Sequence, residues 1–365
     1  MDTYKPAEGS ATRSDIAITD PDFKYPSLWK SNIAADYKFG DGWVATVELL
    51  YSKDINAIYH DNIGLYRTEQ FVNDGGAGNA RPYYNGYYSD REGNQKAANH
   101  VVMLRNTSKG HSLYTTFQLQ KNFVDGILKG LYLNGSYSFG QSRGVTDGTS
   151  SVATSAWKYR AALDGNAEEV GYTAGSFDGR LLLSASYTAN WSKYAATSFG
   201  LIYQRYRPFR YSYCYNGDAN GDSQFSNDLM YIPANFDEVK DHLLPGDFDS
   251  QEDAWKVMNA FIEQDPYLSK HRGEYAERNG AVAPFANQLD LSVSHDIKIY
   301  QKNGRSHTLR FSFNIANFLN LLNRNWGVVQ TTVLGNQQYQ FLTIPKGQGP
   351  SLSLIHISEP TRRRG

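Results

Sequence analysis

The sequence has very little cysteine and no long apolar run. One cysteine, Cys214, stands among 365 residues, which excludes an internal disulfide and so a disulfide-stapled scaffold. No stretch approaches the roughly 18 consecutive apolar residues that a membrane-spanning helix needs, so a helical membrane protein is excluded. The formal net charge is −1, far from a concentrated basic surface. We therefore expect no nucleic-acid partner.

Motifs of common enzymes are absent as well. No P-loop, G-x-S-x-G or H-E-x-x-H sequence occurs. The histidines His271, His295 and His307 have no metal-ligand spacing. Acidic residues are plentiful, but the sequence alone brings no two of them together as a glycosidase pair. We expect a protein that is not an enzyme and requires no cofactor.

Aromatic residues, in contrast, are abundant. The chain has 27 Tyr, 18 Phe and 6 Trp, which together make 14% of it. Tyrosine joins an apolar ring to a hydroxyl that prefers water, so it suits a membrane–water boundary. An aromatic-rich soluble carbohydrate-binding protein has a similar composition, so this count alone does not separate the two classes.

Several segments alternate between apolar and polar residues with a period of two. In 181–191, 289–299 and 309–315 the odd-numbered residues are mainly apolar, and the even-numbered ones are mostly charged, amide or small hydroxyl residues. This is the pattern of β-strands with one apolar face. We expect the odd residues of 289–299 and 309–315 to face lipid. The same pattern is less strict in 43–51, 111–123 and 127–139.

Strand and loop lengths favour a membrane barrel over a soluble sandwich. The predicted strands have about 10 to 14 residues, against about 5 to 6 in soluble proteins and 9 to 11 in membrane barrels. Tight turns alternate with long polar loops near 67–110, 141–178 and 216–285. Membrane barrels place short turns at one end and long loops at the other. We expect an all-β protein with ten crossing strands at 27–38, 42–53, 111–123, 126–140, 179–192, 195–215, 286–300, 305–318, 326–334 and 337–344.

One region resembles a known family. Residues 284–327 contain a Pro-Phe before a strand that opens with Leu289-Asp290-Leu291, and an NFLNLLN run that ends at Trp326-Gly327. This region is similar to the C-terminal part of TonB-dependent receptors of the Bacteroidota, especially the Oar-like group with a carboxypeptidase-regulatory-like domain. Residues 104–123, 216–233 and 271–281 resemble the same group. The resemblance runs over most of 27–344 in the same order.

The resemblance implies a fold, a location and partners. It implies an antiparallel barrel of 22 strands in the outer membrane of a Gram-negative bacterium, sealed by an N-terminal plug that contacts the TonB system. Residues 27–344 would then be roughly the second half of the barrel, and 1–26 the remnant of an extracellular loop. Residues 345–365 would be a truncated end, because LSLIHISEPTR at 352–362 reads like a translated sequencing adapter.

The first candidate binding site is a loop rich in Asp and Asn. Side-chain oxygens at alternate positions of such a loop can converge on calcium. The pattern departs from a calcium loop at Ser223, where a glycine is expected, and at Leu229, where a glutamate is expected. The alternative is an ordinary polar turn. The predicted calcium ligands are Asp218, Asn220, Asp222 and Asp228.

A second candidate site is a stretch in which arginines alternate with tyrosines. Arginine can pair with phosphates and tyrosine can stack on sugars, so the stretch could bind a ligand or lipopolysaccharide. The alternative is a strand that leaves the membrane through an aromatic girdle. The predicted ligand-binding residues are Arg205, Arg207, Arg210, Tyr211 and Tyr213. Residues 250–263 are also predicted to form a helix within the longest loop, capped by Ser250.

These observations lead to one main functional hypothesis and two alternatives. The main one is a TonB-dependent transporter that imports a bulky nutrient such as a glycan, a peptide or a metal chelate, with outer-membrane lipid around it. An adjacent gene for a surface lipoprotein would point to a lidded glycan importer. The alternatives are a surface-exposed binding or adhesion barrel and a passive porin.

Overall fold

The computed structural model describes residues 14–72, 74, 81–87, 98–148, 150–300, 306–330, 338–344, 353–354 and 362–363. Strands account for 53% and helices for 11%, so the protein is all-β, as the sequence predicted. In this part of the chain, no helix is both long enough and apolar enough to cross a membrane.

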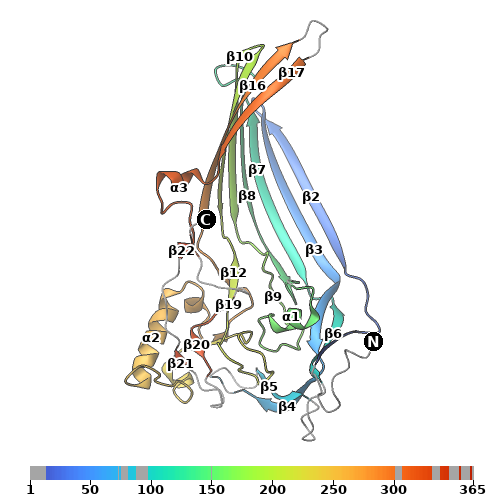
Figure 1. Ribbon diagram of the computed structural model, residues 1–365, viewed down its shortest axis with the longest axis vertical. Coiled ribbons are helices and arrows are strands. Elements are labelled where there is room, and N and C mark those ends of the chain that lie inside the picture. The colour runs from blue at the N-terminus through green and yellow to red at the C-terminus, as the bar shows by residue number, and fades with distance from the viewer. Residues whose placement is uncertain are drawn as a thin grey trace, which may run out of the picture.

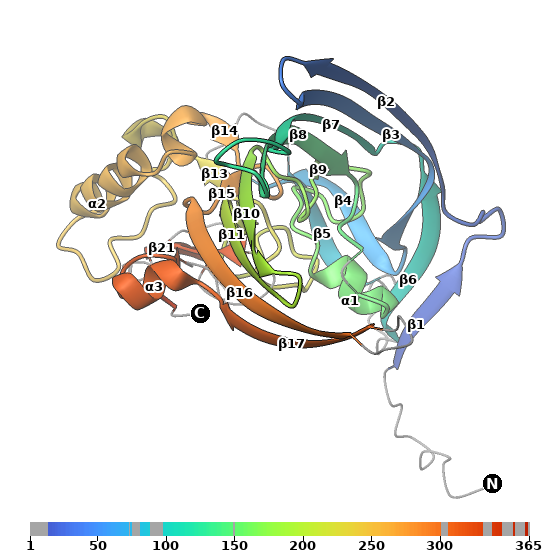
Figure 2. The same cartoon turned by 90° about the horizontal axis from the view of Figure 1, so that it is seen from above.

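One large sheet dominates the molecule. Its strands follow the order β1-β6-β3-β7-β8-β10-β11-β16-β17, and in addition β2 pairs with β3 and β9 with β8. The long strands lie side by side in Figure 1, and Figure 2 shows that they form a curved wall from β2 to β17. The strands are β1 (Ser14–Thr19), β2 (Ser27–Phe39), β3 (Trp43–Asn62), β6 (Ala98–Thr107), β7 (His111–Asn122), β8 (Leu131–Gly144), β9 (Gly171–Tyr172), β10 (Arg180–Ser192), β11 (Ala195–Tyr206), β16 (Ala286–Tyr300) and β17 (Ser306–Ile315).

Two predicted segments differ from the structure near the first long loop. β3 continues to Asn62, well past the predicted end at residue 53. β6 lies within the predicted loop 67–110 and pairs with the far part of β3, while β7 pairs with its near part in the same register. β3 and β6 therefore extend as one hairpin beyond the rest of the sheet. Because this extension contains many polar residues, the apolar–polar alternation of the sequence did not predict it.

The described parts of the last two predicted strands, 326–334 and 337–344, do not form crossing strands. Residues 331–337 lie outside the described residues, and within 326–330 and 338–344 the strands are β18 (Val329–Gln330), β19 (Gln338–Tyr339) and β20 (Leu342–Thr343), of two residues each. β19 pairs with β12 (Arg210–Tyr213), which lies outside the large sheet. The side chains of Phe341 and Leu342 are buried there, so this short apolar stretch fills a core instead of crossing beside β17.

The connections differ greatly between the two ends of the large sheet. Tight turns join β2 to β3 and β10 to β11 at one end. All the long connections lie at the other end, where they form one body with residues 338–344 (Figure 1). We call the described residues of 63–87, 145–179, 207–285 and 338–344 the loop body. It contains β4 (Leu65–Phe71), β5 (Pro82–Tyr87), α1 (Ala153–Lys158), β13 (Tyr231–Ile232), α2 (Gln251–Gln264), β14 (Glu274–Tyr275) and β15 (Ala281–Val282).

Three short elements remain outside this description. The helix α3 (Phe318–Leu322) follows β17 and lies beside β16. In the segment 345–365, β21 (Ser353–Leu354) pairs with β20, and β22 (Arg362–Arg363) pairs with β18. The rest of that segment lies outside the described residues, and the adapter interpretation of it stays a prediction.

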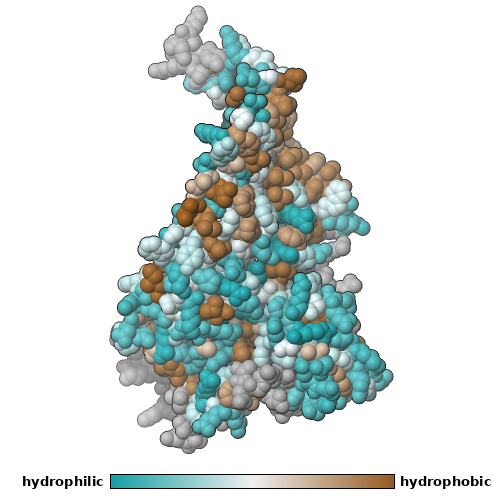
Figure 3. Space-filling model, turned by 180° about the vertical axis from the view of Figure 1, so that it is seen from behind, coloured by the Kyte–Doolittle hydropathy of each residue, from teal (hydrophilic) through white to brown (hydrophobic). Residues whose placement is uncertain are grey.

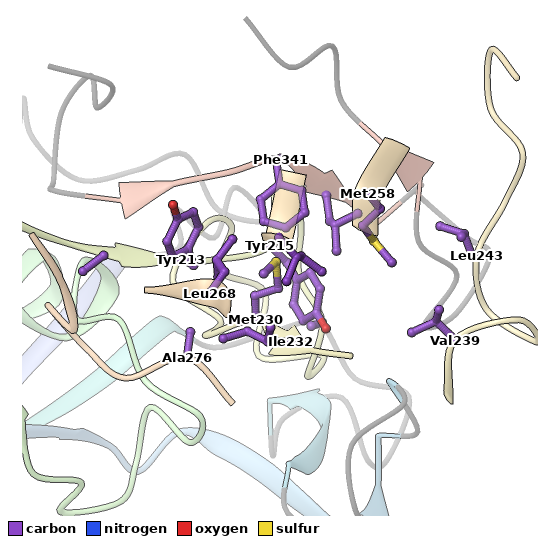
Figure 4. Packing of buried hydrophobic residues seen from close by; sticks show 14 of the residues in the cluster. Tyr213, Tyr215, Met230, Ile232, Val239, Leu243, Met258, Leu268, Ala276 and Phe341 are labelled. Atoms are coloured by element: carbon purple, nitrogen blue, oxygen red, sulfur yellow. The ribbon is translucent and has the colours of Figure 1, made fainter. Parts of the chain in front are cut away.

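The predicted helix in the longest loop is confirmed as α2. The Ser250 hydroxyl accepts a hydrogen bond from the Asp253 backbone N–H at 3.2 Å and donates one to the Asp253 carboxylate at 2.8 Å. This reciprocal cap fixes the start of the helix. Met258 and Ile262, one turn apart, are fully buried in the loop-body core. Figure 4 shows Met258 among the other buried side chains.

The large sheet has one apolar and one polar face. Tyr187, Phe199, Val293 and Phe313 stand in one row across β10, β11, β16 and β17, and all four are exposed. Figure 3 shows apolar residues gathered over the strands and polar residues over the loop body. We call this side, formed by the odd-numbered residues, the apolar face.

Hydrogen bonds between side chains connect strands on the opposite, polar face. Thr188 pairs with Ser198 at 3.0 Å, and Thr116 pairs with Ser138 at 2.9 Å. The ring of Tyr114 on this face stacks on Phe177 of the loop body at 4.5 Å. Since α1, β4 and β5 of the loop body lie inside the curve of the wall (Figure 2), the polar face is the concave one.

Candidate functional site

The loop body has a hydrophobic core of its own. Most of the buried cluster comes from residues 211–281, and Phe341 and Leu342 complete it. Figure 4 shows Tyr213, Met258 and Phe341 converging from three separate segments. The loops are thus folded together as a small domain at the end of the sheet. We take the loop body as the candidate functional region, because large loops on a rigid scaffold are where recognition usually occurs.

Arg81 joins the first long loop to the third. Its guanidinium is fully buried and bonds to the carboxylates of Asp74 at 3.1 Å and Asp228 at 2.8 Å. The rings of Tyr215 and Tyr275 lie 5.6 and 5.5 Å from it. Burial alone would lower the pKa of Arg81, but Asp228 and Asp74 outweigh burial and raise it. The ion pair therefore stays charged in the interior.

Two further arginines bond to the second long loop, Arg278 from the third long loop and Arg160 from within the second loop itself. Arg278 donates to the carbonyl oxygen of Val145 at 2.6 Å and also to that of Gly144. Arg160 donates to the same Val145 oxygen at 3.3 Å. Burial, together with the neighbouring Arg278, lowers the pKa of Arg160 to about 10, so it too remains charged at neutral pH. These bonds satisfy loop carbonyls that have no partner in a regular sheet.

Two of the predicted calcium ligands bond to their own loop. The Asp218 carboxylate accepts backbone N–H bonds from Gly221 at 2.7 Å and Ser223 at 2.8 Å. One oxygen of Asp228 accepts a bond from the Ala219 N–H at 2.8 Å, and the other pairs with an arginine as described above. This is the geometry of the alternative, a polar turn closed by its own side chains.

The other two predicted ligands also bond to each other: the Asn220 side-chain amide donates to the Asp222 carboxylate at 3.3 Å, and its oxygen accepts from the Asp222 backbone N–H at 3.0 Å. Asp222 is fully buried, and burial together with the charges of Asp228 and Asp218 raises its pKa well above the ordinary value. Within the described residues, no group of three or more His, Cys, Asp or Glu side chains could hold a metal ion. Calcium binding in 218–228 thus stays a prediction without geometric support.

The structure does not bring the five predicted ligand-binding residues to one surface. Tyr211 and Tyr213 lie in the loop-body core, and the Tyr213 hydroxyl donates to the Asp265 carboxylate at 2.6 Å. Arg210 is buried and donates to the carbonyl oxygen of Ser176 at 2.9 Å. The predicted strand 195–215 breaks at residues 207–209, so the alternation that suggested a common face does not continue past β11.

Arg205 and Arg207 remain together near the surface. Their guanidinium groups lie 4.5 and 4.1 Å from the ring of Phe285, which is 40% exposed. Arg207 also lies 3.3 Å from the carboxylate of Asp178 and donates to the carbonyl oxygen of Ala283 at 2.9 Å. Arg205 is exposed. Of the five predicted ligand-binding residues, these two are the ones that can still contact a ligand.

Two hollows lie where the sheet meets the loop body. One, of about 410 Å³, is lined by residues of the polar face and loop body that include Phe177, Tyr206 and Phe209. The other, of about 450 Å³, is lined by Tyr203, Phe285 and others near α3. Both are open and mixed in polarity, and neither has the enclosed apolar shape of a typical cofactor site.

Sequence reasoning missed the buried arginines Arg81, Arg160 and Arg278. Each stands in a polar loop without periodicity, where a charged side chain normally indicates solvent exposure. The nearest sequence signal is the density of aspartates that could pair with them, and it does not say which one does.

Comparison with known proteins gives no identification, since no family model, curated protein or solved structure matches the chain.

Proposed function

We propose that this chain forms part of the wall of a transmembrane β-barrel in a Gram-negative outer membrane. In this proposal the whole protein is a TonB-dependent transporter that imports a bulky nutrient such as a glycan, a peptide or a metal chelate. The observation that carries it is the exposed apolar face of the large sheet. Exposed apolar patches of this extent are rare on proteins surrounded by water, because covering them releases free energy.

The distribution of the loops supports the same proposal. Every long connection lies at one end of the sheet, and tight turns lie at the other (Figure 1). Membrane barrels have this asymmetry, with the long loops outside the cell. The loop body then lies at the external mouth, where a nutrient would first meet the protein.

The edges of the sheet support closure by further strands. Among the described residues, β17 pairs along its length with β16 alone, and β2 with β3 alone. Unpaired backbone groups in lipid cost several kcal/mol each, so a membrane sheet must close on itself. We propose that additional strands complete the barrel, in line with the 22 strands of the family that the sequence resembles.

A pair of neighbouring substitutions tests the membrane location. Leu291 lies on the apolar face of β16 and Ser292 on its polar face. In the full-length gene product, Leu291→Arg should make insertion into lipid vesicles less favourable by about 2–4 kcal/mol. Ser292→Arg should have little effect on the free energy of insertion. Equal effects of the two substitutions would disprove the assignment of the faces.

The compact loop body also favours a second candidate, a surface-binding barrel without import. A permeation experiment separates these functions in the full-length protein. A transporter should block solute entry in a liposome-swelling assay and bind the periplasmic domain of TonB. A binding barrel should block solutes without binding TonB, and a porin should let solutes pass.

A further inference from the structure

One arginine is out of place on the apolar face. Arg205 pairs across the sheet with Leu181 and Asn287, and Tyr203, two residues earlier, pairs with Leu183. Arg205 is therefore on the same face as the apolar rows, at the end of β11 next to the loop body. In a membrane barrel this is the level at which hydrocarbon gives way to headgroups.

The charge around Arg205 is not balanced. Within the described residues, no carboxylate lies within 4 Å of its guanidinium, whereas the neighbouring Arg207 meets Asp178 at 3.3 Å. Both arginines lie against the ring of Phe285, which restricts their motion. Two cations and one carboxylate leave a net positive charge at this point of the outer surface.

An amphipathic hollow lies beside these arginines. Its volume is about 450 Å³, and its lining combines Tyr203, Phe285, Leu319 and Trp326 with polar atoms. Trp326 is 52% exposed, which suits a side chain at a membrane interface. Phe285 belongs both to the hollow and to the arginine pair, so the charged and the apolar parts are continuous.

We propose that Arg205 and Arg207 bind the phosphate of an outer-leaflet lipid, with the adjoining part of that lipid in the hollow beside Phe285. Guanidinium groups form strong, often bidentate hydrogen bonds with phosphate. A soluble anion would use the charge but not the aromatic and aliphatic lining, so the shape and polarity favour a lipid. This inference rests on the proposed membrane location.

The experiment uses the full-length protein in phosphatidylcholine nanodiscs that contain lipid A or dephosphorylated lipid A. Lipid retained after extraction is measured by native mass spectrometry, with inorganic phosphate added in a parallel sample. Arg205→Gln should weaken lipid A retention on the order of tenfold, about 1.4 kcal/mol. Arg205→Lys, which keeps the charge without the planar fork, should have a smaller effect.

Arg180 provides the matched control. It starts β10 directly before Leu181 and pairs with Tyr206, so it lies on the polar face one residue away from the proposed site. Arg180→Gln should retain lipid A like the unchanged protein. Equal retention of the two lipids, or no loss in Arg205→Gln, would overturn the inference. Displacement by inorganic phosphate would show a general anion site and would also overturn it.

Insertion of each variant is measured separately by protease protection of the strands. If all variants insert but show no preference for lipid A, the lipid site is wrong and the membrane location stands. If the unchanged protein inserts into neither lipid mixture, the proposed function itself fails.

Discussion

Arg81 illustrates how a single side chain can hold distant loops together. It balances Asp74 and Asp228 in a site without solvent, so removing its charge leaves two carboxylates buried without a cation. Breaking a buried ion pair in this way costs about 3–5 kcal/mol. We expect Arg81→Met to lower the stability of the loop body by this order, measured by denaturant unfolding of the full-length protein in detergent.

Arg67→Met is the control for this prediction. Arg67 pairs with Asp164 at 3.2 Å, but its side chain is 54% exposed, so its loss should cost about 0–1 kcal/mol. Combining Arg81→Met with Asp74→Asn and Asp228→Asn should recover part of the loss. A triple variant as unstable as Arg81→Met would mean that packing, not charge, sets the effect.

Asp222 should make the loop body sensitive to pH. Burial first, and then Asp228 and Asp218, raise the pKa of Asp222 in the folded state. The unfolded chain therefore loses this proton at a lower pH than the folded chain does, and stability falls as pH rises from about 4 through the raised pKa. Asp222→Asn should flatten this dependence in unfolding experiments at pH 4 to 7.

Calcium bound to this loop would oppose the loss of stability that the ionisation of Asp222 causes. It would favour the charged form of Asp222, so it would stabilise the unchanged protein at neutral pH and fail to stabilise Asp222→Asn. Any affinity should be in the extracellular range, about 10⁻⁴–10⁻³ M. Calorimetric heat that Asp222→Asn leaves unchanged would exclude 218–228 as the binding loop.

The helix α2 gives a test of packing. Met258 is fully buried in the loop-body core, while the adjacent Val257 is 39% exposed. Met258→Ala should destabilise the loop body by about 2–5 kcal/mol, because it removes apolar contacts and leaves a cavity. Val257→Ala should stay within about 0.5 kcal/mol. Protease cleavage within 236–270 at increasing temperature measures both, and similar cleavage of the two variants would argue that α2 is not packed.

The strands show how far a sequence can predict this fold. Strands β2, β10, β11, β16 and β17 agree with the predicted segments at most of their ends, because alternation with period two reports directly on two different environments. The stretch 337–344 looked like another strand, yet Phe341 and Leu342 are buried in the loop body. A short apolar stretch can form either a strand of the sheet or part of a buried core. Contacts with residues distant in the sequence decide which of the two forms.

The candidate sites were less predictable than the strands. Arg205, Arg207 and Arg210 follow one another with similar spacing, yet one is buried and two meet Phe285 near the surface. The break between β11 and β12 decides this, and alternation alone gave no sign of it. The bonds of Arg81 and Arg278 join residues more than 130 positions apart, which no local pattern reports.

The molecule as a whole combines two solvation patterns. The large sheet exposes apolar residues on its convex face, and the surface of the loop body is mostly polar (Figure 3). The loop body buries a cluster of apolar residues instead, as a protein in water does. In the proposed membrane location each part would have the surroundings that suit it, lipid for the sheet and water for the loop body. This division explains why the loops need a core and buried ion pairs of their own.

If the three long loops form one cooperative unit, loosening one contact between them should loosen all three. From its place in the third loop, Arg278 bonds to Val145 of the second loop and to Gly144 at the end of β8. We expect Arg278→Met to speed amide hydrogen exchange together in the described parts of 63–87, 145–179 and 207–285, measured by mass spectrometry in detergent. Lys240→Met, an exposed change in the same third loop, should affect only its neighbours. Faster exchange confined to residues near 278 would mean that the loops open independently, and a lid that moves one loop at a time would then replace the single body.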